Sequence, residues 1–187
     1  MKIDPKSTSL VIIDMLNDFV KKNGSLVVPK AKELLPNQKK LVDEAHKANA
    51  HVMYLADNHQ PDDDEFEKWP PHAVVGTWGS GIVDELKPES NNQVIPKRRY
   101  SGFFGTDLDL RLRERGIDTV VLAGVLTDIC VMYTSADASA RGYTVVVVSD
   151  ATASTSEENH NFALRHMKEV HGSILATTKE VIESFHA

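Results

Sequence analysis

Five side chains capable of acid–base, nucleophilic or metal chemistry follow four separate apolar stretches of this 187-residue chain. They are Asp14, Asp57, His59, Lys97 and Cys130. Each apolar stretch has the length and composition of a β-strand. Because ligands of open parallel sheets bind beyond the carboxyl ends of the strands, we expect these side chains to meet at one edge of a sheet. A carboxylate, an imidazole, an ammonium and a thiol gathered there indicate a reactive site.

Cys130 is the candidate nucleophile. Thr127 is expected to cap the helix that follows an apolar strand, which would place Cys130 in the first helical turn. Free N–H groups and the helix dipole at that position are expected to stabilise a thiolate, to lower the pKa of the thiol and to hold an oxyanion. The alternative is a buried structural cysteine, which is the commoner state of an isolated thiol.

Asp14 and Lys97 have chemistry that suits a neighbouring thiol. Asp14 can accept the thiol proton and later give a proton to a departing amine. Lys97 can keep this carboxylate ionised and favour the thiolate. Considered singly, Asp14 would equally suit the cap of a turn, and Lys97 would be an ordinary surface lysine.

A second group of residues has the chemistry of a metal site. Asp57 and His59 share one face of an extended segment, and Glu65 and His72 lie further along the same loop. This set of nitrogen and oxygen ligands suits zinc, iron or manganese. The alternative is a polar loop with two incidental histidines. The acidic run 62–64 within this loop is expected to be a solvated tip.

The elements that must position these residues alternate between strand and helix patterns. Strands are expected at 9–13, 51–55, 93–95, 119–123, 144–148 and 173–175, and helices at 29–48, 107–115, 128–141 and 157–170, followed by a short final helix. The alternation predicts a single α/β domain over residues 1–187, a three-layer α/β/α sandwich with a doubly wound, parallel six-stranded sheet. The expected strand order, 3-2-1-4-5-6, would place Asp14 beside Cys130.

Composition narrows the classes of partner and compartment. The net charge of −6 disfavours nucleic acid or an anionic membrane as a partner. The first residues lack the apolar run of a signal peptide, and no stretch approaches the ~18 apolar residues of a membrane span. A single cysteine excludes an internal disulfide and indicates a reducing, cytoplasmic compartment.

Five segments resemble the motifs of the isochorismatase-like cysteine hydrolases and, within them, the nicotinamidase (pyrazinamidase) subgroup. They are VIIDMLNDF (11–19), DNH (57–59), WPPHAVVGT (69–77), PKRRYSGFFGTDL (96–108) and GVLTDICVMYTSADA (124–138). The resemblance spans most of the chain and implies a catalytic triad of Asp14, Lys97 and Cys130. It also implies a cis peptide between Val125 and Leu126 that would direct the backbone N–H groups of Leu126 and Cys130 at an oxyanion.

The same resemblance implies a cofactor and a substrate. One divalent ion, zinc in the first place with iron or manganese as alternatives, would hold the pyridine nitrogen of nicotinamide. Its ligands would be Asp57, His59 and His72, with Glu65 as the fourth; water is the alternative to Glu65, and Glu67 is the nearby competitor. Aromatic side chains at three positions would sandwich the ring: Phe19, Trp69 and Tyr100.

The expected reaction is hydrolysis of nicotinamide to nicotinate and ammonia through a thioester, a step of NAD salvage. Leu16 stands where many family members have Gln, and Ala73 where many have Cys, so either could alter the pocket. One alternative is an amidase acting on a ureido or carbamoyl substrate with the same triad. Another is a non-catalytic metal-binding scaffold with an inert Cys130. The expected partner is a small amide, and a homo-oligomer is an expectation from the family alone.

Overall fold

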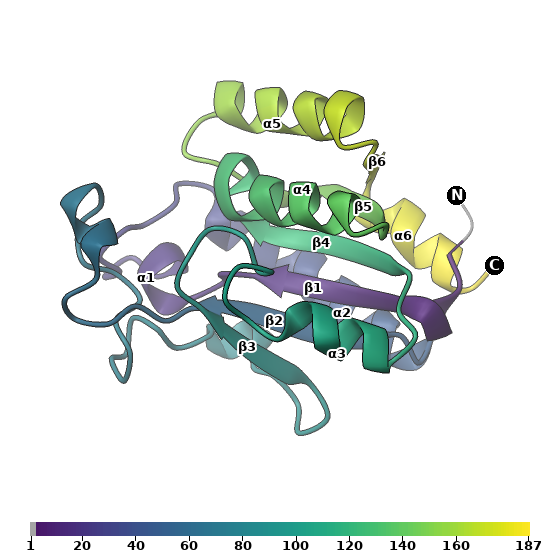
Figure 1. The fold of residues 1–187 in the computed structure, drawn as a ribbon, viewed down its shortest axis with the longest axis horizontal. Helices are drawn as coiled ribbons and strands as arrows, with labels where there is room; N and C mark the ends of the chain where they lie inside the picture. The colour runs from purple at the N-terminus through teal and green to yellow at the C-terminus, as the bar shows by residue number, and fades with distance from the viewer. Residues whose placement is uncertain (1–2) are drawn as a thin grey trace.

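The computed structural model describes residues 3–187, in which six parallel strands form one sheet with helices on both faces (Figure 1). The strands are β1 (Thr8–Ile13), β2 (His51–Asp57), β3 (Gln93–Lys97), β4 (Thr119–Val125), β5 (Thr144–Ala153) and β6 (Ile174–Ala176). Their order, β3-β2-β1-β4-β5-β6, confirms the predicted doubly wound topology. β1 and β4 are therefore neighbours at the point where the winding reverses, which is where such sheets bind ligands.

The helices divide between the two faces of the sheet. They are α1 (Asn17–Val20), α2 (Leu35–Lys47), α3 (Leu108–Glu114), α4 (Met132–Ala140), α5 (Glu157–Val170) and α6 (Thr178–Phe185). Alternate residues of β1 separate two cores: Leu10 packs in the core that holds residues of α2 and α6, and Val11 in the core that holds residues of α3, α4 and α5. Burial on both faces explains why the strands are continuously apolar.

Short helical turns complete the fold and account for two differences from the predicted elements. They lie at Pro5–Ser7, Ala31–Leu34, Asp64–Glu67 and Asp84–Leu86, with a π-helical turn at Thr127–Val131. The predicted helix 29–48 starts only at Leu35, with Pro36 in its first turn, where the missing N–H of proline costs no helical hydrogen bond. The predicted helix 128–141 is divided between the π-helical turn and α4.

Gly124 brings β4 unusually close to β1. Its φ is 122°, and a Cβ atom at this position would lie 2.0 Å from the carbonyl oxygen of Ile13. That oxygen belongs to the backbone of a central strand and cannot move aside. The close approach occurs one residue before Asp14 on β1, so Gly124 sets the spacing of the two strands that lead into the site.

Gly124→Ala is expected to lower the free energy of unfolding by about 2–3 kcal/mol, because φ strain adds to a backbone collision. Gly142→Ala is the matched control, since Gly142 also has a positive φ of 82° but open space around its Cα. Its expected cost is about 1 kcal/mol. Urea denaturation of both variants measures the difference, and equal losses would contradict the role of close strand approach.

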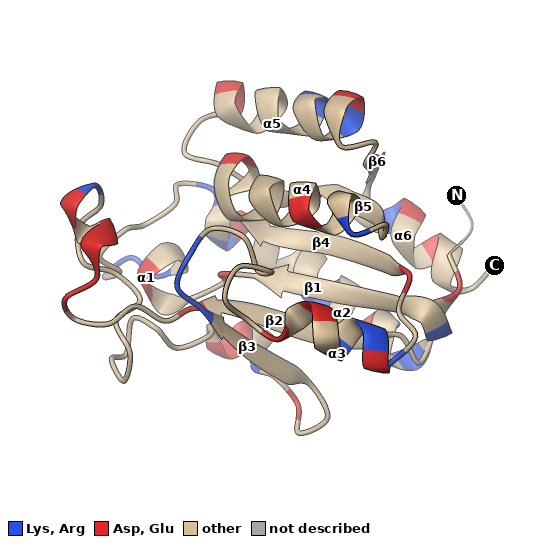
Figure 2. Ribbon diagram, viewed as in Figure 1, with Lys and Arg blue, Asp and Glu red and all other residues tan. Residues whose placement is uncertain are grey.

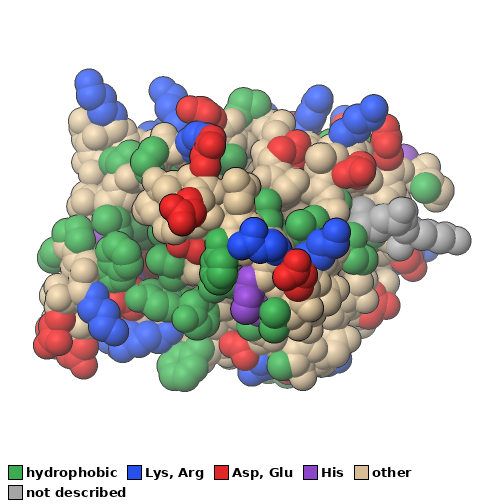
Figure 3. All heavy atoms as spheres, turned by 90° about the horizontal axis from the view of Figure 1, so that it is seen from above, with side chains coloured by type: hydrophobic (Ala, Val, Ile, Leu, Met, Phe, Trp, Pro, Cys, Tyr) green, Lys and Arg blue, Asp and Glu red, His purple; other side chains and the backbone are tan. Residues whose placement is uncertain are grey.

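Charged residues lie mainly in helices and loops, while the middles of the strands are nearly free of them (Figure 2). The face seen in Figure 3 carries acidic and basic side chains interspersed with hydrophobic ones. Within residues 3–187, no helix combines the length and the apolar character needed to cross a membrane.

Candidate active site

Hydrogen bonds between strand ends assemble the first part of the site. The N–H of Asp14 donates to the carbonyl of Leu55 at 2.9 Å, and the N–H of Asp57 donates to Asp14 Oδ1 at 2.8 Å. Asp57 and Lys97 are paired residues at the ends of β2 and β3. Asp14 has a left-handed φ of 54°, a conformation that Asp tolerates better than most residues and that recurs at functional sites.

Lys97 is the centre of this group. Its Nζ lies 2.8 Å from Asp14 Oδ2, 2.5 Å from Asp57 Oδ1 and 3.4 Å from Cys130 Sγ. All four residues are buried, and the ligand atoms of Asp14, Asp57 and Cys130 lie within 4.8 Å of one another. The structure thus brings together the three residues predicted as a triad, and the lysine ammonium supplies the positive charge that two buried carboxylates require.

The charges of this group support one another. Burial would lower the pKa of Lys97, but Asp14 and Asp57 outweigh it and raise the pKa well above its ordinary value. Burial, together with the charge of Asp57, raises the pKa of Asp14 to about 6 despite Lys97. Burial also opposes ionisation of Asp57, but Lys97 and His59 lower its pKa to about 2. At neutral pH the lysine is charged, and Asp14 is ionised yet basic enough to accept a proton.

Two expectations about Cys130 are wrong. Burial raises the pKa of its thiol well above the ordinary value, although Lys97 acts in the opposite direction. Thr127 is not the helix cap, because the π-helical turn follows Leu126 without a side-chain cap, and Thr127 Oγ1 instead lies 2.8 Å from His160 Nδ1. Cys130 therefore rests as a thiol, and any nucleophilic attack by its sulfur would require loss of that proton. The Asp14 carboxylate is near enough to take that proton.

The peptide bond between Val125 and Leu126 is cis, as the family resemblance implies. It lies between the end of β4 and the turn that carries Cys130. Both Leu126 and Cys130 line the pocket, so the turn that would supply the oxyanion hole borders the space in which a substrate would bind.

Asp57, His59 and His72 form the group expected for a metal. Their ligand atoms lie within 4.8 Å of one another, and all three residues are buried. His59 Nε2 has no hydrogen-bond partner among the described residues and lies 3.6 Å from Asp57 Oδ2; His72 Nε2 lies 4.0 Å from the same oxygen. His59 Nδ1 lies 3.2 Å from the Asp63 carboxylate, and His72 Nδ1 donates to the Pro70 carbonyl at 2.8 Å.

These contacts fit a divalent cation. The Asp63 carboxylate and the Pro70 carbonyl each accept a hydrogen bond from an Nδ1–H group. The Nε2 lone pairs of His59 and His72 are therefore available, and they face the Asp57 carboxylate. Metal-binding histidines have this arrangement, with the second ring nitrogen donating to a carboxylate or a backbone carbonyl. Two imidazoles and a carboxylate are a typical ligand set for zinc.

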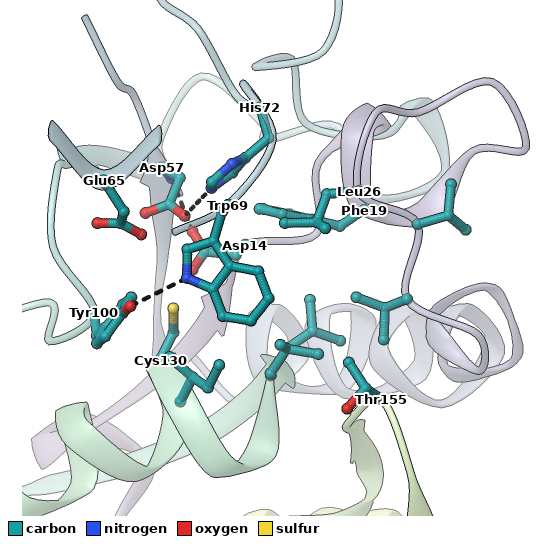
Figure 4. A pocket seen from close by; sticks show the side chains of 15 residues that line it. Asp14, Phe19, Leu26, Asp57, Glu65, Trp69, His72, Tyr100, Cys130 and Thr155 are labelled. Carbon is teal, nitrogen blue, oxygen red and sulfur yellow. Dashed lines mark hydrogen bonds and ion pairs between the residues drawn. The ribbon is translucent and has the colours of Figure 1, made fainter. Parts of the chain in front are cut away.

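Glu65 lies beside this group without joining it. Its carboxylate points into the pocket near Asp57 (Figure 4), but it is not among the ligand atoms that lie within 4.8 Å of one another. Burial raises the pKa of Glu65. Glu67, the competing residue, is exposed and does not line the pocket. The assignment of Glu65 as the fourth ligand stays a prediction.

A pocket lined by Cys130 also contains three of the proposed metal ligands, Asp57, Glu65 and His72 (Figure 4). Several apolar residues line the same pocket: Leu26, Val27, Val28, Val125, Leu126 and Ile129. The three aromatic residues predicted to bind a ring, Phe19, Trp69 and Tyr100, all line it. The indole of Trp69 lies across the pocket, and its Nε1 donates to Tyr100 Oη at 3.2 Å.

The two residues that depart from the family pattern do not line this pocket. Leu16 and Ala73 are both fully buried. Ala73 has a left-handed φ of 45°, and its N–H donates to Asp18 Oδ2 at 2.8 Å. Any effect of either residue on a substrate must therefore pass through neighbouring residues.

Residues 8–180 match the family model of the isochorismatase domain. The chain belongs to the isochorismatase family. Among its relatives, the uncharacterized isochorismatase family protein PncA of Bacillus subtilis (strain 168) is 37% identical over 179 residues, which are 90% of this chain and 98% of the relative. The protein is thus an amidohydrolase of the isochorismatase family.

Solved structures of three similar proteins share the fold. A pyrazinamidase/nicotinamidase of Streptococcus mutans UA159 has a TM-score of 0.85 at 39% identity, over 91% of this chain and 100% of its own. N-carbamoylsarcosine amidase of Thermoplasma acidophilum has a TM-score of 0.85 at 38% identity, over 95% and 97%. A pyrazinamidase of Pyrococcus horikoshii in complex with zinc has a TM-score of 0.87 at 29% identity, over 91% and 99%.

Three residues that support this isochorismatase-family site had no role assigned from the sequence. Asp18, the second aspartate of the first motif, is buried and accepts from the N–H groups of Ala73 and Ser25, at 2.8 and 3.0 Å. His160 contacts the Cys130 turn through Thr127. Asp63 contacts His59. An aspartate inside a family motif was a signal for Asp18, whereas nothing local in the sequence distinguishes the other two.

Proposed function

We propose that this protein is a nicotinamidase that hydrolyses nicotinamide to nicotinate and ammonia. The observation that carries the proposal is one pocket that holds a buried thiol and carboxylate together with two residues of a nitrogen and oxygen metal set, Asp57 and His72. A small flat amide offers little surface, so its orientation must come from a few strong contacts. A metal contact to a ring nitrogen and aromatic side chains around the ring are contacts of that kind.

The charge of the pocket favours a neutral substrate. None of its lining residues, all within 3–187, is an arginine or lysine, whereas Asp14, Asp57 and Glu65 line it. Lys97 is itself buried, and its ammonium pairs with the carboxylates of Asp14 and Asp57. A carbamoyl amino acid such as N-carbamoylsarcosine carries a carboxylate, and no arginine or lysine among these lining residues could pair with it. Nicotinamide carries no such group, which supports it over the ureido or carbamoyl alternative.

In the proposed first step, Cys130 Sγ attacks the carboxamide carbon while the Asp14 carboxylate takes the thiol proton. The carbonyl oxygen becomes an oxyanion that accepts hydrogen bonds from the backbone N–H groups of Leu126 and Cys130. As the C–N bond breaks, Asp14 returns its proton to the departing amine, so that ammonia leaves and a thioester remains. Lys97 stays protonated and balances the changing charge of Asp14.

In the second step, water replaces the thiol as the nucleophile. Water attacks the thioester carbon, and Asp14 accepts the proton of that water. Breaking the C–S bond then returns the proton held by Asp14 to Cys130 as a thiol, and the product leaves as nicotinate after its carboxyl proton passes to solvent. Release of nicotinate would place the protein in NAD salvage. The sole cysteine must stay reduced to act, which agrees with a cytoplasmic location.

Asp57, His59 and His72 would hold the cofactor, with Glu65 or water completing its ligands. We propose zinc, because the ligand set suits it and a similar pyrazinamidase binds it. When bound, the ion would supply a Lewis-acid contact for the pyridine nitrogen. The protein itself provides the aromatic contacts and the oxyanion hole.

Nicotinamide is expected to exceed benzamide in kcat/KM by at least about 10²-fold, because benzamide keeps the carboxamide but lacks the ring nitrogen that would orient it. Ammonia release from both amides and from N-carbamoylsarcosine measures the preference. Removing the metal with a chelator should reduce nicotinamide turnover to the level of benzamide, and restoring zinc should recover it.

Each alternative gives a different result in the same assay. Equal turnover of nicotinamide and benzamide, or no effect of chelation, would refute the role of the metal as substrate anchor. Faster turnover of N-carbamoylsarcosine would favour the carbamoyl amidase. A metal-loaded protein that releases no ammonia from any of the three amides would favour a non-catalytic scaffold.

A further inference from the structure

Asp63 is not part of a solvated acidic tip, so that prediction is wrong at the middle residue of the run. Its side chain is completely buried, whereas Asp62 and Asp64 on either side are exposed. Figure 2 shows this acidic segment in red and the basic segment that follows β3 in blue. The contact between the two segments explains the burial of Asp63.

The Asp63 carboxylate is contacted by hydrogen-bond donor groups from four residues. Oδ2 lies 3.2 Å from His59 Nδ1 and accepts from Arg98 Nε at 2.9 Å. Oδ1 accepts from an Arg99 guanidinium N–H at 3.1 Å and from the backbone N–H of Glu65 at 3.2 Å. The two arginine side chains are half exposed, so their charges balance a carboxylate that has no access to water itself.

This arrangement controls which nitrogen of His59 carries the proton. A carboxylate can only accept, so it holds the proton on Nδ1 and leaves the lone pair on the buried, unpartnered Nε2. His72 is held in the same state by a backbone carbonyl. Of these two histidines, only His59 has a side chain as the group that determines which ring nitrogen carries the proton.

We propose that Asp63 is the positioning residue for the metal ligand His59, and that Arg98 and Arg99 hold the Asp63 carboxylate in position. The inference rests on the metal site of the proposed function, but not on nicotinamide as the substrate. Arg98 and Arg99 directly follow Lys97, so their contacts with Asp63 also connect the metal-binding loop to the strand that carries the buried lysine.

The test compares Asp63→Asn with Asp62→Asn, which makes the same change at the exposed neighbour. Metal-free protein is titrated with zinc in competition with a chromophoric chelator. Asp63→Asn is expected to raise the zinc Kd by about 10–100-fold, the usual effect of losing such a partner, while Asp62→Asn leaves it unchanged. The double variant R98A/R99A should raise the Kd in the same direction by a smaller factor.

A second readout reports the tautomer itself. In metal-free wild-type protein, at a pH high enough to keep His59 neutral, imidazole ¹⁵N NMR should show His59 protonated on Nδ1, and Asp63→Asn should show a mixture of tautomers. Unchanged zinc affinity in folded Asp63→Asn would overturn the inference, as would a loss of thermal stability without a change in Kd. If Asp63→Asn does not fold, unchanged affinity in R98A/R99A overturns it.

The inference and the proposed function fail separately. Turnover of nicotinamide does not enter this test. Wild-type protein that binds zinc but does not hydrolyse nicotinamide would overturn the proposed function and leave the role of Asp63 standing. Wild-type protein that does not bind zinc would overturn the role of Asp63.

Discussion

Cys130→Ala is expected to lower kcat for amide hydrolysis by at least about 10⁴-fold, because the step that forms the thioester has no other nucleophile. Among the residues that line the pocket, Cys130 supplies the thiol beside Asp14. The side chain is small and buried, so its loss removes little packing. Ammonia release from nicotinamide measures the effect.

Metal content is the control for this variant. Cys130 Sγ is not in the group formed by Asp57, His59 and His72, so Cys130→Ala should retain the zinc stoichiometry and the circular dichroism of the wild type. Turnover retained within tenfold of wild type would refute nucleophilic catalysis by this cysteine. Loss of both metal and secondary structure would show that the variant tests folding instead of chemistry.

Lys97→Met is expected to lower the free energy of unfolding of the metal-free protein by about 3–5 kcal/mol, the usual cost of removing one partner from a buried ion group. Asp14 and Asp57 would then face each other in a buried site without a counter-charge. Hydrolysis of nicotinamide should be lost as well, since Asp14 would no longer be held ionised.

Lys40→Met is the matched control, because Lys40 is exposed on α2 and both side chains are good helix formers. The free energy of unfolding of Lys40→Met should stay within about 0.5 kcal/mol of the wild-type value. Urea denaturation of both variants, after removal of metal, gives the comparison. Equal stability of Lys97→Met and Lys40→Met would mean that the buried ammonium is not needed to hold the strand ends together.

The architecture was predictable because its causes are local and repeated. Continuous apolar strands alternating with helical patterns require a parallel sheet covered on both faces, and the reactive residues follow the strands directly. Strand order predicted that Asp14 would lie near Cys130. Lys97 ends β3, which is separated from β1 by β2, and its long side chain reaches Asp14 from there. The start of α2 was missed because the apolar spacing extends into a tighter turn before Pro36.

The site details that were missed depend on distant contacts. The pKa of Cys130 was expected to fall from its place at the start of a helix, but burial by the surrounding fold determines its direction. Three consecutive aspartates look alike in the sequence. Contacts with Arg98 and Arg99, more than thirty residues away along the chain, help to distinguish Asp63 from its two exposed neighbours.

The Asp57 carboxylate serves both halves of the site, with Oδ1 against Lys97 and Oδ2 facing the histidines. The two halves are therefore not free to diverge independently in evolution. A lineage that no longer needed a metal could replace His59 and His72, but replacing Asp57 would also take a counter-charge from Lys97. We expect metal-free descendants of such a site to lose the histidines first and to keep an acidic residue at position 57, as a trace of the ion that their ancestors bound.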